Sequence, residues 1–195
     1  MLNDVIRQLE NSILVKSLVI ENSEILSEIC NAVEVIINCC KQNSKVMIAG
    51  NGGSAADAQH FAGELVNRFN FDRKGLPCIA LTTDTSVMTA IGNDSSYDKL
   101  FWKQIEALGR PGDVFIGIST SGNSPNIVEA MQLCKEIGIT TIGLTGEKAS
   151  KMDSLCDYII KVPSDETPRI QEAHITIEHI ICDMVEKAIF DKRNL

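Results

Sequence analysis

The sequence predicts an α/β fold: one three-layer domain with a five-stranded parallel sheet flanked by helices, preceded by an N-terminal helical arm. The first observation behind this prediction is that short apolar runs alternate with helical segments from residue 44 onward, which is typical of parallel strands joined by right-handed crossovers. The second is that these runs are continuously apolar, as expected of strands covered on both faces. The third is a length of 195 residues with 44% apolar and 23% charged residues, which suits one globular domain.

The helical arm is expected over residues 1–43 and the α/β core over residues 44–195. Apolar side chains recur at helical spacing from Leu2 to about Cys40 without glycine or proline, and they predict two helices that meet near Glu21–Ser23. Their apolar stripes are wider than the ~100° that a helix needs to cover one face of a sheet. We therefore expect the surplus surface to pack against the same helices of other subunits in a closed oligomer.

The core is expected to alternate five strands with five helices. The predicted strands are Lys45–Gly50, Leu76–Thr82, Asp113–Ser119, Ile139–Thr145 and Asp157–Val162. The predicted helices run from Ser54 to about Phe69, Ser96 to Leu108, Pro125 to Ile137, Lys148 to Leu155 and Pro168 to about Lys192. Ligands of open parallel sheets bind beyond the carboxyl ends of the strands, so a site is expected there.

Composition narrows the classes of partner. A formal net charge of −8 argues against a protein that mainly holds nucleic acid or anionic lipid, since both require a basic surface. The N-terminus lacks the apolar stretch of a signal peptide, and the longest apolar runs are too short to cross a bilayer. The seven cysteines include no C-x-x-C pair and are expected to be buried free thiols in a reducing cytosol. We therefore expect a cytoplasmic protein without nucleic-acid or membrane partners.

The first strand runs into a glycine-rich segment, Gly50-Asn51-Gly52-Gly53-Ser54, which we call the glycine loop (residues 50–54). Its glycines allow a sharp turn and a close approach to a ligand. Ser54 and Asp57 have the spacing of a capping box, so a helix is expected to begin there, with free backbone N–H groups for an anion. The alternative is a plain turn from strand to helix.

The third strand ends in a hydroxyl-rich segment, which we call the serine loop (residues 119–124). Its hydroxyls belong to Ser119, Thr120, Ser121 and Ser124, and Pro125 suits the first position of the following helix. Hydroxyls and backbone N–H groups together can hold a phosphate without lysine or arginine, although a solvated loop with one capping serine is the alternative. No G-K-[ST] follows either loop, which disfavours nucleotide hydrolysis.

Histidines on two helices are candidate metal ligands. His60 and Glu64 are four residues apart on the helix that follows the glycine loop, so they share one face. The last helix carries Gln171, His174 and His179, and helical spacing alone does not choose between the two histidines. Zn²⁺ accepts histidine nitrogen and carboxylate oxygen. The alternative is that these side chains merely pack or face water.

Together these segments resemble the sugar isomerase (SIS) domain, and more narrowly the bacterial phosphoheptose isomerase family. The resemblance covers nearly the whole chain and rests on the motifs GNGGS (50–54), DAQHFAGEL (57–65), GND (92–94), GISTSGNS (117–124) and RIQE (169–172), with His179 beyond. The serine loop marks only the superfamily. The set of His60, Glu64, Gln171 and His179 is much more specific.

The resemblance implies an aldose–ketose isomerase that converts sedoheptulose 7-phosphate to D-glycero-D-manno-heptose 7-phosphate through an enediol, supplying heptose for lipopolysaccharide, capsule or other surface glycans. It implies one Zn²⁺ per subunit of a homotetramer, with sites near subunit boundaries and with His174 outside the metal shell. Glu64 is then the base and His179 the acid. The implied metal ligands are His60, Glu64, Gln171 and His179; the phosphate contacts are Ser119, Thr120, Ser121 and Ser124; the sugar contacts are Asn51, Gly52, Gly53, Asn93 and Asp94, with Glu64 and Gln171.

The chemistry of such a reaction agrees with these residue types. Moving a proton between two carbons requires a base, an acid for the oxygens, and a group that stabilises the enediolate charge, for which a bound Zn²⁺ is suited. Two other hypotheses remain. One is a different SIS isomerase, acting on arabinose 5-phosphate or a hexulose phosphate, whose metal residues should differ. The other is a non-catalytic SIS protein that binds a sugar phosphate or a partner and does not need the metal set.

Overall fold

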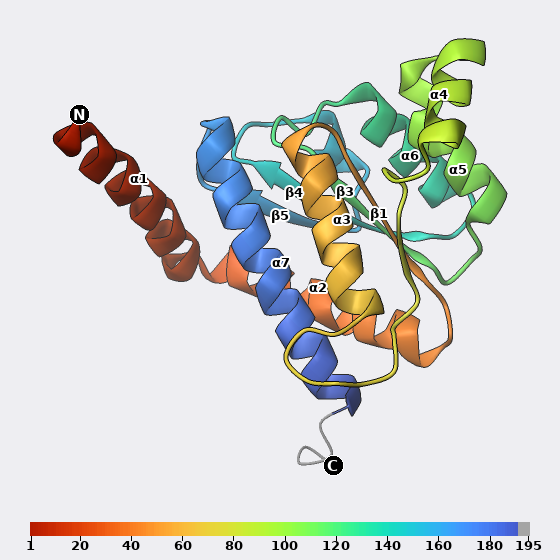
Figure 1. Ribbon diagram of the computed structural model, residues 1–195, viewed down its shortest axis with the longest axis horizontal. Helices are drawn as coiled ribbons and strands as arrows, with labels where there is room; N and C mark the ends of the chain where they lie inside the picture. The colour runs from red at the N-terminus through yellow and green to blue at the C-terminus, as the bar shows by residue number, and fades with distance from the viewer. Residues whose placement is uncertain (191–195) are drawn as a thin grey trace.

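The predicted three-layer α/β architecture is confirmed by the computed structural model, which describes residues 1–190 (Figure 1). Five strands form one sheet in the order β2-β1-β3-β4-β5, and every neighbouring pair is parallel. The strands are β1 (Val46–Gly50), β2 (Cys78–Ala80), β3 (Val114–Ile118), β4 (Thr140–Gly146) and β5 (Tyr158–Val162). Their carboxyl ends meet at one edge of the sheet, where the glycine and serine loops follow β1 and β3.

Helices cover both faces of the sheet. On one face lie α1 (Leu2–Glu21), α2 (Ser23–Lys41), α3 (Gly53–Val66) and α7 (Thr167–Phe190), and Figure 1 shows α3 and α7 side by side. On the other lie α4 (Thr85–Asp94), α5 (Leu100–Leu108) and α6 (Pro125–Glu136), with the short 3₁₀ helices η1 (Tyr97–Lys99) and η2 (Lys151–Ser154). Among the described residues, no helix is long and apolar enough to span a membrane.

Strand β1 shows why the strands read as continuous apolar runs. All five of its residues are buried. Val46 and Ile48 pack in the core beneath α2, α3 and α7, whereas Met47 and Ala49 pack in the core beneath α5 and α6. Successive side chains of a strand point to opposite faces, so a strand with two covered faces has no position left for a polar side chain.

The structure corrects several local expectations. Helix α4 was not predicted: none of its residues is buried, although the Asp84 carboxylate caps it by accepting the Val87 N–H at 2.9 Å. The capping box expected at Ser54 is wrong, because Gly52 occupies the N-cap and no side chain caps α3. The predicted strand 76–82 is paired only over Cys78–Ala80, at an edge of the sheet.

The cysteines agree only partly with expectation. All seven are free thiols. Cys30 is exposed, and Cys78 and Cys156 are half-buried, so the expectation that all seven are buried is wrong for these three. Burial raises the pKa of the Cys40 thiol to about 11, which keeps this thiol protonated and unreactive at neutral pH.

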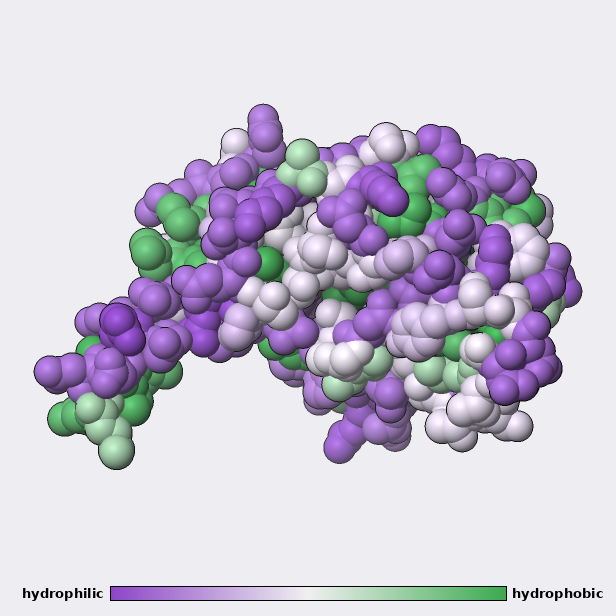
Figure 2. Space-filling model, turned by 90° about the horizontal axis from the view of Figure 1, so that it is seen from above, coloured by the Kyte–Doolittle hydropathy of each residue, from purple (hydrophilic) through white to green (hydrophobic). Residues whose placement is uncertain are grey.

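The first helix projects from the body of the molecule (Figure 1). Only Val15 and Val19 of α1 are buried, while large apolar side chains along it are exposed, including Leu9 at 61% and Ile13 at 63%. Figure 2 shows apolar surface gathered on this projecting arm. The second helix differs, because seven of its residues, Ile29 among them, lie in the core. The unpartnered apolar surface expected of both helices is therefore concentrated on α1.

Candidate active site

The glycine loop makes the turn from β1 into α3. Gly52 adopts a φ of 56°, a conformation that side-chain-bearing residues rarely adopt, and it is the N-cap of α3. The amide of Asn51 exchanges two hydrogen bonds with the amide of Asn126, at 2.9 and 2.8 Å. Asn126 lies at the start of α6 and is almost fully buried. This pair therefore ties the glycine loop to the helix that follows the serine loop.

The hydroxyls of the serine loop converge, as expected. Ser119 Oγ lies 2.9 Å from Ser124 Oγ and 3.5 Å from Ser121 Oγ. Ser124 is the N-cap of α6, but its side chain does not bond the helix backbone. A hollow of about 240 Å³ beside the loop is lined by Thr120 and Ser121 and also by Glu147, Lys148 and Asp165, of which the last two form an ion pair at 3.1 Å. The hydroxyls of the loop, not a surplus of positive charge, are what a small anionic group would bind.

Three of the four predicted metal ligands, His60 and Glu64 of α3 and His179 of α7, come together. His60 Nε2 lies 3.0 Å from His179 Nε2 and 3.0 Å from Glu64 Oε1, and His179 Nε2 lies 3.6 Å from the same oxygen. We call these three side chains the histidine–glutamate cluster; it is the one group of three or more potential ligands found among residues 1–190. A tetrahedral Zn²⁺ with bonds of about 2.0–2.1 Å sets its ligand atoms about 3.3 Å apart. The triangle of donor atoms therefore fits a zinc ion.

The two histidines of α7 lie in different surroundings. His174 is fully buried and donates from Nε2 to the Thr145 carbonyl at 3.2 Å, so it lies away from the cluster. Burial lowers the pKa of His174 to about 4, against the opposing effect of that hydrogen bond. Gln171 lies at the glycine loop: a Cβ on Gly53 would be 2.5 Å from its Nε2. The Gln171 amide thus connects the start of α7 to the glycine loop.

Asn93 and Asp94 lie at the end of the exposed helix α4, where Asn93 Nδ2 donates to Asp94 Oδ1 at 2.7 Å. Their predicted sugar contacts stay a prediction. The link from this region to the glycine loop is Tyr97, whose hydroxyl donates to Asn51 Oδ1 at 3.1 Å. Tyr97 and Asn126 were not among the predicted site residues, since neither belongs to a motif that spacing could mark.

A buried carboxyl near Glu64, that of Glu178, was not among the predicted site residues. Glu178 is fully buried, and neither of its oxygens has a hydrogen-bond partner. Burial, followed by the nearby Asp57 and Glu64 carboxylates, raises its pKa to about 8. A glutamate adjacent to His179 and inside an apolar stripe was the signal that could have found it. In the metal-free protein such a pKa favours the neutral form of Glu178 at neutral pH, so it adds little negative charge to the cluster.

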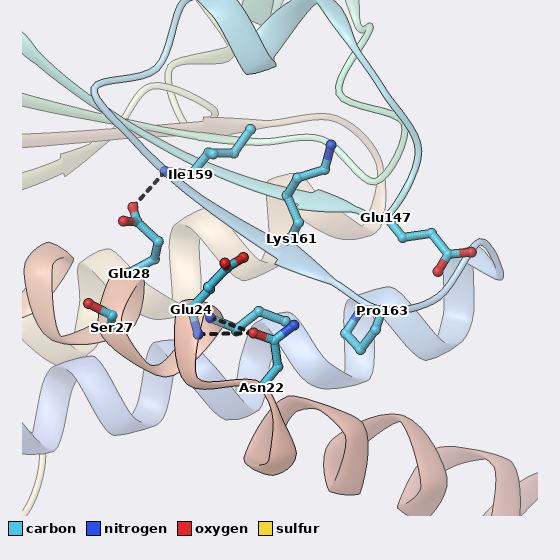
Figure 3. Close-up of a pocket in the computed structure, with 9 residues that line it drawn as sticks. Asn22, Glu24, Ser27, Glu28, Glu147, Ile159, Lys161 and Pro163 are labelled. Carbon is cyan, nitrogen blue, oxygen red and sulfur yellow. Dashed lines mark hydrogen bonds between the residues drawn. The ribbon is translucent and has the colours of Figure 1, made fainter.

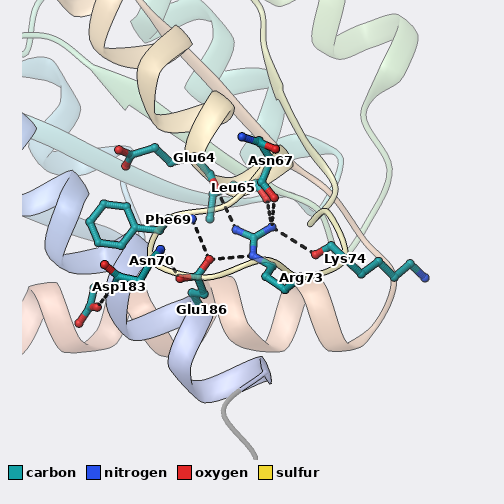
Figure 4. Close-up of polar contacts among 9 residues, drawn as sticks. All are labelled: Glu64, Leu65, Asn67, Phe69, Asn70, Arg73, Lys74, Asp183 and Glu186. Atoms are coloured by element: carbon teal, nitrogen blue, oxygen red, sulfur yellow. Dashed lines mark hydrogen bonds and ion pairs between the residues drawn. The ribbon is translucent and has the colours of Figure 1, made fainter.

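A buried ion pair lies at the far end of α3 (Figure 4). The Arg73 guanidinium pairs with Glu186 of α7 at 2.9 Å, with exposed side-chain fractions of 3% and 0%. The pKa of Glu186 is below its usual range: burial alone would raise it, but hydrogen bonds from the N–H groups of Phe69 and Asn70 and from Arg73 outweigh that effect. The pair therefore stays ionised at neutral pH.

Another hollow, of about 660 Å³, lies between α2 and β5 and contains none of the predicted site residues (Figure 3). Two of its polar side chains take part in local structure. Asn22 caps α2 by accepting the Glu24 N–H at 3.0 Å, and Glu28 accepts the N–H of Ile159 at 3.2 Å. The chemistry of the molecule is therefore expected at the carboxyl edge of the sheet, away from this hollow.

Comparison with known proteins agrees with this geometry. Residues 14–146 match the SIS domain. The phosphoheptose isomerase of Aneurinibacillus thermoaerophilus is 57% identical over 190 residues, covering 97% of this chain and 96% of that protein. The chain belongs to the phosphoheptose isomerase family. The Clostridium acetobutylicum member of that family is 51% identical, with 99% of this chain and 98% of that protein covered.

Solved structures of the family have the same fold. The phosphoheptose isomerase of Neisseria gonorrhoeae superposes with a TM-score of 0.89 at 41% identity, covering 96% of this chain and all of that one. The Francisella tularensis enzyme gives 0.91 at 35% identity, with 95% and 98% covered. The Vibrio vulnificus NanR protein, at 14% identity and a TM-score of 0.68, shares the fold alone. The predicted family resemblance is thus confirmed.

Proposed function

We propose that this chain is an aldose–ketose isomerase that converts sedoheptulose 7-phosphate to D-glycero-D-manno-heptose 7-phosphate through an enediol. Membership of the phosphoheptose isomerase family, at 57% identity over nearly the whole chain, is the observation that carries this proposal. The histidine–glutamate cluster agrees with it, because two imidazoles and a carboxylate within 3.0–3.6 Å of one another supply the acid, the base and the metal ligands that the reaction needs.

The two loops supply the binding surface. We assign the substrate phosphate to the serine loop, whose converging hydroxyls of Ser119 and Ser124 donate without adding charge. The sugar then extends past the glycine loop toward the cluster. Asn51 is held there by Asn126 and Tyr97, so its amide is preorganised before substrate arrives. Asn93 and Asp94 are proposed to contact the sugar from the end of α4.

The cluster supplies the proton chemistry. We assign Glu64 as the base that removes the proton next to the carbonyl, and His179 as the acid that serves the oxygens. Glu64 Oε1 faces both imidazoles, while its Oε2 has no hydrogen-bond partner. Because Oε2 is buried, Oε1 is the oxygen that faces the cluster, and we assign to it both the metal contact and the role of base.

We propose that His60, Glu64, Gln171 and His179 hold one Zn²⁺ per subunit. Bound there, Zn²⁺ is a Lewis acid for the developing enediolate charge. The chain's part is to present neutral imidazole nitrogens and a carboxylate oxygen at a tetrahedral spacing. Purified protein is expected to contain about one zinc per chain, and a chelator should remove both zinc and activity. Active protein in which elemental analysis finds no metal would exclude this assignment.

The exposed arm and the family membership support proposals about assembly, cellular location and the use of the product. We propose a cytoplasmic homotetramer in which the apolar face of α1 packs against other subunits, and a product that supplies heptose for surface glycans such as lipopolysaccharide or capsule. The exposed fractions of Leu9 and Ile13 support the assembly, since monomers rarely expose more than a few hundred Å² of contiguous apolar surface. The division into an arm (1–43) and a core is part of this proposal.

A direct assay tests the activity. Purified protein should isomerise sedoheptulose 7-phosphate, and arabinose 5-phosphate should be a far poorer substrate. Glu64→Gln and His179→Gln should each lower kcat by about 10²–10⁴-fold, the usual cost of losing acid–base catalysis. Glu106→Gln, at an exposed site on α5, is the matched control and should retain full activity. Full activity of Glu64→Gln would refute the mechanism, and a preference for arabinose 5-phosphate would favour another SIS isomerase.

A further inference from the structure

The buried ion pair of Arg73 and Glu186 joins the two helices that carry the histidine–glutamate cluster (Figure 4). Arg73 lies in the segment between α3 and β2, and Glu186 lies on α7. A charged pair removed from water is often no more stabilising than an apolar pair of similar volume, so a role in specifying one arrangement is worth testing. The surrounding contacts indicate which arrangement this pair specifies.

On the α3 side, one guanidinium reaches the last turn of the helix. Arg73 Nη2 donates to the Glu64 carbonyl at 2.8 Å, and Nη1 donates to the Leu65 carbonyl at 2.6 Å and to the Asn67 carbonyl at 3.2 Å. The last carbonyls of a helix have no intrahelical partner, so this side chain caps α3. One of the capped residues is Glu64, the proposed base.

On the α7 side, Glu186 holds the segment that carries Arg73. Its Oε1 accepts from Arg73 Nε at 2.9 Å and from the Phe69 N–H at 2.7 Å, and its Oε2 accepts from the Asn70 N–H at 2.6 Å. Phe69 is thereby fixed with its ring centroid 5.9 Å from that of His179. The ring packs beside the imidazole proposed as the acid.

The same pair therefore sets the position of both proposed proton-transfer groups. Glu186 follows His179 by seven residues, which is two turns along the same face of α7. Arg73 ties that face to the backbone of Glu64, so the pair fixes how α3 and α7 lie along each other at the cluster. A displacement of about 1 Å at a reacting group can cost 10²-fold in rate.

We propose that Arg73 and Glu186 are positioning residues for the reaction: they hold Glu64 and His179 in register and, through Phe69, orient the His179 imidazole. This inference rests on the proposed function. Neither residue touches the serine loop in any described contact, so binding of the substrate phosphate is independent of the pair. A purely structural pair would change only the stability of the fold.

The test compares Arg73→Lys with Arg110→Lys. Arg110 is the matched control, because its Nη1 also donates to carbonyls at a helix end, those of Ala107 and Gly109 on the opposite face of the sheet. Lysine keeps the charge but lacks the planar fork that reaches several acceptors. Arg73→Lys should lower kcat and weaken Zn²⁺ affinity, each by about 10- to 100-fold, the usual cost of losing an outer partner of a metal ligand. KM should stay unchanged, and Arg110→Lys should match the parent in all three quantities.

Phe69→Leu is the second variant, because it leaves the ion pair in place and removes only the ring beside His179. It should lower kcat and shift the pH profile of kcat while the midpoint of unfolding stays close to that of the parent. Unchanged kcat and Zn²⁺ affinity in folded Arg73→Lys would overturn the inference, as would loss through KM alone. An inactive parent protein would instead refute the proposed function, and Zn²⁺ affinity would still test the pair.

Discussion

Acid is expected to destabilise this protein through one buried imidazole, His174. Its side chain is fully buried, its Nε2–H donates to the Thr145 carbonyl, and its Nδ1 has no partner. The neutral ring fits this site and the charged ring does not, because a proton on Nδ1 would place an unpaired charge in the core. Burial therefore lowers the pKa of His174 to about 4.

The size of the effect follows from the two protonation equilibria. In the unfolded chain the imidazole takes up a proton near its ordinary pKa of about 6.5, whereas the folded chain resists protonation until about pH 4. The contribution to stability is thus complete above pH 6.5, falls as the pH drops, and is lost below pH 4. At 1.36 kcal/mol per pH unit, the loss of unfolding free energy between pH 7 and pH 4.5 is about 2.5 kcal/mol.

Urea unfolding of metal-free protein at pH 7.0, 6.0, 5.0 and 4.5, at one protomer concentration, measures this loss. His174→Gln is the comparison, because its amide can donate to Thr145 but does not titrate. Other titrating groups cancel in the difference between the two proteins. That difference should shift in favour of the variant by about 2.5 kcal/mol across the range. A difference that is independent of pH would refute the assignment of a buried neutral ring.

Three further outcomes are expected. Gly53→Ala should leave the unfolding midpoint nearly unchanged but weaken Zn²⁺ binding about 10- to 100-fold in a metal titration, because its Cβ would displace the flexible Gln171 amide. The pKa of Glu178 is raised to about 8 in the folded chain, so the contribution of its neutral form to the free energy of unfolding is lost as the pH rises from about 4.5 to 8. Glutamine does not titrate, so the melting temperature of Glu178→Gln should rise relative to that of the parent as the pH increases. Leu9→Asp combined with Ile13→Asp should reduce the mass measured by light scattering, and an unchanged mass would contradict packing through α1.

The sequence predicted most of the fold because doubly covered strands have a strong apolar signal. Helix α4 escaped prediction for the opposite reason: none of its residues is buried, so no apolar stripe marks it, and its Asp84 cap is a short local signal. Ser54 was wrongly assigned as a cap because the positive φ of Gly52, which decides where α3 begins, cannot be read from a serine–aspartate spacing.

The contacts of the candidate site were likewise predicted only in part. Helical spacing placed His60 beside Glu64 and left His174 and His179 as alternatives, of which the family resemblance named His179; the structure places His179 Nε2 3.0 Å from His60 Nε2. The pairing of Arg73 with Glu186 could not be predicted, because the two residues are separated by 113 positions and form no sequence motif. Such pairs depend on how α3 and α7 pack, which no local pattern of residues encodes.

In the proposed oligomer, the projecting first helix would make part of chain folding depend on protein concentration. Helix α1 is 20 residues long, yet only Val15 and Val19 are buried by the rest of the chain. In proteins, most of the stability of a helix comes from the tertiary packing of its apolar face. In the proposed assembly its helical content depends on a surface that a second molecule supplies, so it becomes a function of protein concentration. Dilution would unwind the arm before it disturbs the sheet, and circular dichroism would record the loss as a concentration-dependent signal at constant temperature.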